Sequence, residues 1–90
     1  MNKETIKRLV DSLYNNLSTM SADNPSFYAN IYAEKYNSIL KEMKLIYKDE
    51  SFIQGMKELS TVQEDSAELR RLFRNVNVSI NQLKAYLDAQ

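Results

Sequence analysis

The chain has 90 residues, with twelve basic and twelve acidic side chains, no cysteine, no histidine, and only one glycine and one proline. This length is typical of one small domain, which we expect to cover residues 1–90. The missing cysteine and histidine exclude disulfides, thiolate metal sites and the commonest general base. The balanced charge argues against general attraction to nucleic acid or an anionic membrane.

No segment reaches the run of about 18 apolar residues that a membrane-spanning helix needs, and the N-terminus lacks the apolar core of a signal peptide. We therefore expect a cytoplasmic protein without a membrane partner. A chain so poor in glycine and proline is typical of a mostly helical protein, because strands need frequent turns.

The first predicted helix covers about residues 3–20. At the helical pitch its apolar side chains share one arc of roughly 140°. The arc contains Ile6, Leu9, Val10, Leu13, Tyr14, Leu17 and Met20. Such an arc predicts an amphipathic helix with one buried face.

The second predicted helix begins at Pro25, which suits the first helical position, and ends near Tyr47. It carries tyrosines four residues apart on the same arc, roughly 120° wide, as its apolar residues. The arc contains Tyr28, Tyr32, Tyr36, Ile39, Leu40, Met43, Ile46 and Tyr47. We interpret the tyrosines as core, with Tyr32 the most central. The alternatives are a ligand- or base-stacking surface and a protein interface.

A short third helix is predicted from Ser51 to Leu59, because Ser51 and Gln54 match a capping box. Its apolar face consists of Phe52, Ile53, Met56 and Leu59. A second capping box, either Ser60 with Gln63 or Thr61 with Glu64, predicts where the last helix begins.

The last helix is predicted to continue to the C-terminus, with an apolar arc of roughly 100°. The arc contains Leu69, Leu72, Phe73, Val76, Ile80, Leu83 and Leu87. Residues 75–81 alternate with the period of a strand, but Val76 and Ile80 fit the helical arc and a lone strand has no partner. The predicted fold is therefore all-α, a small three- to four-helix up-and-down bundle of three long helices and one short one.

Few residue groups could carry chemistry. Glu64, Asp65 and Glu68 could bind a cation, but they better match the acidic residues that favour a helix N-terminus. The serines have neither a histidine nor a Ser-x-x-Lys motif to activate them. We expect no enzymatic activity, no metal site and no cofactor.

A basic face on the last helix is formed by Arg70, Arg71 and Arg74. Arginines on one helix can bind phosphates, and nearby asparagines can contact bases. Acidic residues one to two turns away weaken that field. A solvated face, a protein-binding patch and a nucleic-acid surface are all compatible with this pattern.

Several apolar residues lie off the predicted core arcs. They either pack against neighbouring loops and the short helix, or form an exposed apolar surface that is surrounded by charged residues and binds a partner. Together with the basic face they give the candidate partner surface Phe27, Ile31, Leu45, Arg71, Arg74 and Val78. Arginine and aromatic residues often anchor interfaces.

The sequence thus favours a non-catalytic protein–protein interaction or oligomerisation module, which binds itself or another protein. It could be an N-terminal adaptor domain of a longer protein or a small inhibitor or immunity-type protein. The alternative is a nucleic-acid-binding regulator that uses the basic face of the last helix.

Overall fold

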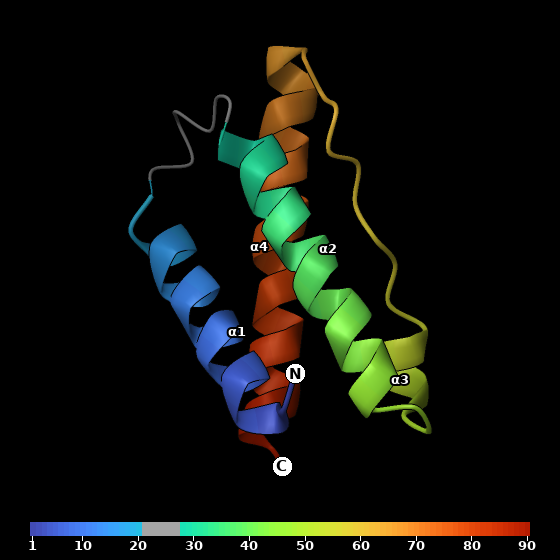
Figure 1. Cartoon of the computed structure of the whole chain (residues 1–90). Coiled ribbons are helices and arrows are strands. Elements are labelled where there is room, and N and C mark those ends of the chain that lie inside the picture. Colours follow the sequence, from blue (N-terminus) through green and yellow to red (C-terminus); the bar gives the residue numbers. More distant parts are fainter. Residues whose placement is uncertain (21–27) are drawn as a thin grey trace.

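The computed structural model describes residues 1–20 and 28–90, and Pro25 and Phe27 lie outside this part. The described residues form four helices and no strand: α1 (Lys3–Ser18), α2 (Tyr28–Ile46), α3 (Ser51–Gln54) and α4 (Ser66–Asp88). The prediction of an all-α bundle with three long helices and one short helix is confirmed. In Figure 1, α1 and α2 lie in front of α4, and α3 lies beside the lower end of α2.

The core forms where the apolar arcs of the three long helices meet. Its buried helical residues are Ile6, Val10, Leu13 and Leu17 in α1, Ala29, Ala33, Tyr36, Ile39, Leu40 and Met43 in α2, Ile53 in α3, and Leu69, Leu72, Phe73, Val76, Ile80, Leu83 and Leu87 in α4. The arc of α4 matches the sequence prediction, and the helix passes unbroken through residues 75–81. Apolar periodicity therefore outweighs the weak helix propensity of that segment.

The burial of the three tyrosines of α2 differs from the prediction. Tyr36 is completely buried, Tyr32 is only partly buried, and Tyr28 is 52% exposed. The predicted central position of Tyr32 is wrong because the buried face of α2 is centred further round the helix, where Ala29 and Ala33 are also buried.

The short helix α3 ends earlier than predicted. It stops at Gln54 rather than Leu59, and the N–H of Gly55 donates to the carbonyl of Ser51. The predicted capping role of Ser51 is also wrong, because Glu50 occupies the N-cap position without a side-chain bond. The Gln54 amide instead donates to the carbonyls of Lys44 and Tyr47, at 2.9 and 3.1 Å, and so caps the end of α2.

The last long helix begins later than predicted. Its N-cap is Asp65, whose carboxylate accepts from the N–H groups of Ala67 and Glu68 at 3.1 and 3.2 Å. Both predicted capping boxes at residues 60–64 are therefore wrong. A carboxylate at the N-cap satisfies two free N–H groups and also matches the positive end of the helix dipole.

Residues 55–65, which we call the strap, run the length of α2 without regular secondary structure. Figure 1 shows the strap leaving α3 at the lower end and reaching the start of α4 at the upper end. Because the strap brings the chain back before α4 begins, α4 runs in the same direction as α2, whereas α1 and α2 are antiparallel. The predicted up-and-down order therefore holds for α1 and α2 but not for the two long helices α2 and α4.

Candidate functional site

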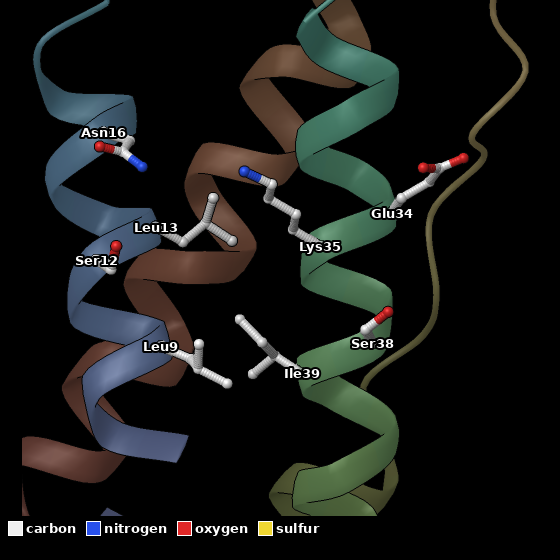
Figure 2. Close-up of a pocket in the computed structure, with 8 residues that line it drawn as sticks. All are labelled: Leu9, Ser12, Leu13, Asn16, Glu34, Lys35, Ser38 and Ile39. Carbon is white, nitrogen blue, oxygen red and sulfur yellow. The ribbon is translucent and has the colours of Figure 1, made fainter. Parts of the chain in front are cut away.

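A groove lies between α1 and α2, on the side away from α4. It encloses about 450 Å³, and its lining residues are Leu9, Ser12, Leu13 and Asn16 from α1 and Glu34, Lys35, Ser38 and Ile39 from α2. Figure 2 shows Leu9, Leu13 and Ile39 pointing into the space between the two helices, with α4 behind them. We call this feature the α1–α2 groove.

The floor of the groove is apolar. Leu13 and Ile39 are 3% and 6% exposed, whereas Leu9 is 39% exposed. The prediction that Leu9 is core is wrong, because Ile6 and Val10 take the fully buried positions of the same helical face and leave Leu9 at its edge. Leu9 and Leu13 are one turn apart, so both present side chains along the groove.

The charged residues that line the groove are Glu34 and Lys35 of α2. In Figure 2 the Lys35 side chain extends toward α1 above Ile39, while Glu34 points the other way, toward the strap. The Lys35 Nζ lies 5.6 Å from the centre of the Tyr32 ring, and within residues 1–20 and 28–90 it forms no ion pair. An apolar floor with one available cation suits an amphipathic ligand.

Two residues of the candidate partner surface lie on the outer side of α2. Ile31 is 45% exposed and Leu45 is 64% exposed. Because they are two heptads apart, they lie on the same side of the helix, about 21 Å from each other. Neither residue lines the groove.

The remaining predicted residues lie on α4. Val78 is 57% exposed in a shallow depression that also includes Arg74, and Arg71 forms an ion pair with Glu68 at 2.9 Å. Val78 is on the opposite side of α4 from the residues that pack against α1 and α2. The structure therefore does not combine Ile31 and Leu45 with Arg74 and Val78 in one surface.

The titratable groups with shifted pKa values have structural roles. Lys84 of α4 lies 3.0 Å from Asp11 of α1 and 3.4 Å from Asp88. The Asp11 hydrogen bond raises the pKa of Lys84. Burial raises the pKa of Tyr36 and of Tyr86. No group of three or more metal-ligating side chains occurs in the part of the chain that the structure describes.

Two asparagines of α2 hold the strap. The Asn37 side chain donates to the carbonyl of Leu59 and accepts from the N–H of the same residue, both at 2.8 Å. Asn30 makes the same pair of bonds with Gln63, at 2.8 and 3.1 Å. The Tyr36 hydroxyl adds a bond to the carbonyl of Lys57 at 3.3 Å. We call the two side chains the asparagine clamps.

Sequence reasoning missed both the clamps and the groove. Asparagine is an unfavourable residue in the interior of a helix. Two asparagines seven residues apart lie on the same side of a helix, and this pattern indicates a polar contact with another segment. The groove has no such signal, because its existence depends on how far apart α1 and α2 pack.

Among the described helices, none combines the length and the apolar character that crossing a membrane requires. Comparisons of the chain with protein-family models, with curated proteins and with solved structures give no significant match.

Proposed function

We propose that this protein is a non-catalytic interaction module that binds an amphipathic helix of another protein in the α1–α2 groove. The observation that carries the proposal is the apolar floor of a groove of about 450 Å³, with Leu9 39% exposed at its mouth. Apolar surface of this kind, rimmed by polar side chains, is characteristic of partner sites.

A helix is the occupant that suits this shape. The groove runs between two antiparallel helices, so a third helix laid along it packs against both, as in a four-helix bundle. Partner side chains at i and i+4 can then contact Leu9 and Leu13, which are themselves one turn apart. A small molecule is a poorer match, because small-molecule pockets bury about 70–90% of their ligand and this groove is open to solvent along one side.

The charges of the rim indicate what the partner helix carries. Lys35 lies at one end of the groove and has no carboxylate partner among the described residues. An aspartate or glutamate on the partner, next to its apolar stripe, would pair with this ammonium. Such a pair adds to specificity and orientation more than to affinity.

The test of this proposal is site-specific photo-cross-linking in the cells that produce the protein. A photoreactive amino acid replaces Ser12, which lines the groove, and in a matched variant Val78 on the outer side of α4. We expect one discrete cross-linked protein from position 12, with the cross-link mapped by mass spectrometry to an amphipathic helix, and none from position 78. Equal cross-linking from both positions, or cross-linking from position 78 alone, would contradict the proposal.

A nucleic-acid-binding regulator is the second candidate. It is favoured by Arg70 and Arg74, which are exposed on α4, but Arg71 is paired with Glu68 at 2.9 Å. Binding to duplex DNA and to single-stranded RNA across a salt series distinguishes the two functions. We expect no binding tighter than the non-specific range of about 10⁻⁴–10⁻⁶ M at physiological salt. A nanomolar complex weakened by Arg74→Ala would favour the second candidate.

A further inference from the structure

The asparagine clamps form a binding site for extended polypeptide, and the strap of the same chain occupies it. Asn30 and Asn37 are seven residues apart, which separates them by about 10.5 Å along α2. Their partners Gln63 and Leu59 are four residues apart, which spans about 13 Å in an extended chain. Lys41 continues the same antiparallel order, with its Nζ 3.7 Å from Glu58. The side chains of α2 are thus spaced to hold an extended segment.

The clamps recognise backbone rather than side chains. Each asparagine amide donates to the C=O and accepts from the N–H of one strap residue, the exchange that a neighbouring β-strand makes. The strap side chains contribute less, since Val62 is 79% exposed and only Met56 and Leu59 pack against the core. The strap is therefore attached mainly through polar contacts to its backbone, and such segments open more readily than apolar cores.

We propose that two copies of this chain exchange the strap together with α4, so that the clamps of each copy bind the strap of the other. A second copy is the occupant the structure supports, because residues 57–63 of this chain are the extended segment seen to fit the clamps. The exchanged copy also supplies the complete apolar arc of α4, so every contact inside the bundle is recreated. This inference is independent of the partner helix proposed for the groove.

The hinge for this exchange lies between α3 and the strap. The turn there is closed by two bonds, from the Gly55 N–H to the Ser51 carbonyl at 2.9 Å and from the Met56 N–H to the Ile53 carbonyl at 3.1 Å. Straightening the turn breaks these two bonds and no bond of the clamps. Gly55 is the only glycine of the chain, and glycine accepts a wide range of backbone conformations.

The experiment uses two ion pairs that report on the exchange without any mutation. Lys41 with Glu58 joins α2 to the strap, and Lys84 with Asp11 joins α4 to α1. Equal amounts of ¹⁴N- and ¹⁵N-labelled protein are unfolded together and refolded at high concentration, and the dimer fraction is isolated by gel filtration. A carbodiimide then joins amines to adjacent carboxylates, and the linked peptides are analysed by mass spectrometry.

In exchanged dimers, about half of the linked peptides at both pairs should carry one light and one heavy partner, because copies of either label pair at random. Peptides of uniform label from the monomer fraction show that each pair can be linked. Mixed labels at Lys84–Asp11 alone would mean that α4 leaves without the strap, which overturns the proposal. The absence of a dimer, or of mixed labels at both pairs, overturns it as well.

A hinge variant gives a second, independent measurement. Gly55→Pro removes the N–H that closes the turn and disfavours helical geometry at the preceding residue. We expect the dimer-to-monomer ratio after refolding to rise at least about tenfold. Ser60→Pro, which lies within the strap and leaves the hinge unchanged, should not raise it. An equal or lower ratio for Gly55→Pro than for the parent protein contradicts a hinge at this position.

Discussion

Asn37 of α2 and Leu59 of the strap exchange two hydrogen bonds of 2.8 Å, one from the amide nitrogen to the carbonyl and one from the N–H to the amide oxygen. The two residues are 22 positions apart in the chain. Because both backbone groups of Leu59 are satisfied by a side chain, the strap needs no helix or sheet of its own. This contact holds the middle of the strap against α2.

The first prediction concerns this contact. Asn37→Ala leaves two partly buried backbone groups without a protein partner, so we expect it to lower the free energy of unfolding by about 2 kcal/mol. Asn75→Ala is the matched control, because Asn75 is exposed on α4; a surface change of this kind alters stability by about 0.5 kcal/mol or less. Urea denaturation measures both. Equal midpoints for the two variants would show that the clamp contributes nothing to stability.

The second prediction concerns the tyrosines of α2. Tyr36→Ala removes a fully buried ring and should cost about 3–5 kcal/mol, whereas Tyr28→Ala, at 52% exposure, should cost less than about 1 kcal/mol. Tyr36→Phe removes the hydroxyl, which donates to the carbonyl of Lys57 and also forms a hydrogen bond with the Ser79 side chain, and should cost about 1 kcal/mol. Thermal and urea unfolding of the three variants gives the order. A Tyr28→Ala variant less stable than Tyr36→Ala would refute the placement of α2.

The third prediction locates the start of α4. Asp65→Ala removes the carboxylate that accepts from two N–H groups of the first turn, and an N-cap lost in this way costs about 0.5–2 kcal/mol. Ser60→Ala and Thr61→Ala should have almost no effect, because the helix does not begin there. The decisive comparison is Asp65→Ala against Thr61→Ala in one denaturation series. A larger loss for Thr61→Ala would move the helix start back to the strap.

The fourth prediction is a loss of stability at alkaline pH. Burial raises the pKa of Tyr36 above 10.0, and the Asp11 hydrogen bond raises the pKa of Lys84 above 10.5. Both groups bind their protons more tightly in the folded state, so their contribution is complete below these unfolded values and is lost as the pH rises through the folded ones. Unfolding midpoints should therefore fall above about pH 10.

A variant isolates the contribution of Tyr36 in that pH range. Tyr36→Phe cannot ionise at this position, so its midpoint should fall less steeply with pH than that of the parent protein. Tyr28→Phe, on an exposed ring, should follow the parent curve. A Tyr36→Phe curve as steep as the parent's would show that another group causes the alkaline loss.

The sequence predicts the long helices well because their apolar arcs are repeated over several turns, as in the arc of α4 from Leu69 to Leu87. It fails for residues 55–65, because local propensity there is overridden by hydrogen bonds from Asn30 and Asn37. Leu9 shows a different failure. Its position on an apolar arc predicts burial, but its 39% exposure depends on how closely α1 and α2 pack.

The described apolar residues that lie off the predicted core arcs are exposed, as expected from their positions on the helices. Ile31, Leu45 and Val78 are all exposed, although they do not form one surface. Apolar periodicity predicts which side of its own helix a residue occupies. The relative positions of the helices depend on how their side chains pack, which periodicity does not predict. The sequence therefore assigns the groove residues to their two helices. It does not predict that the residues of α1 and the residues of α2 line one groove.

The α1–α2 groove is tested most directly by the affinity of the cross-linked partner's helix for two charge variants of this protein. Leu9→Glu places a carboxylate in the apolar groove, and Val78→Glu places one at an exposed valine on the far side of the molecule. Both variants should fold, as circular dichroism can verify. By isothermal titration calorimetry we expect Leu9→Glu to weaken binding at least about 30-fold, or about 2 kcal/mol, and Val78→Glu to bind like the parent. Unchanged binding by folded Leu9→Glu would contradict the groove as the binding site.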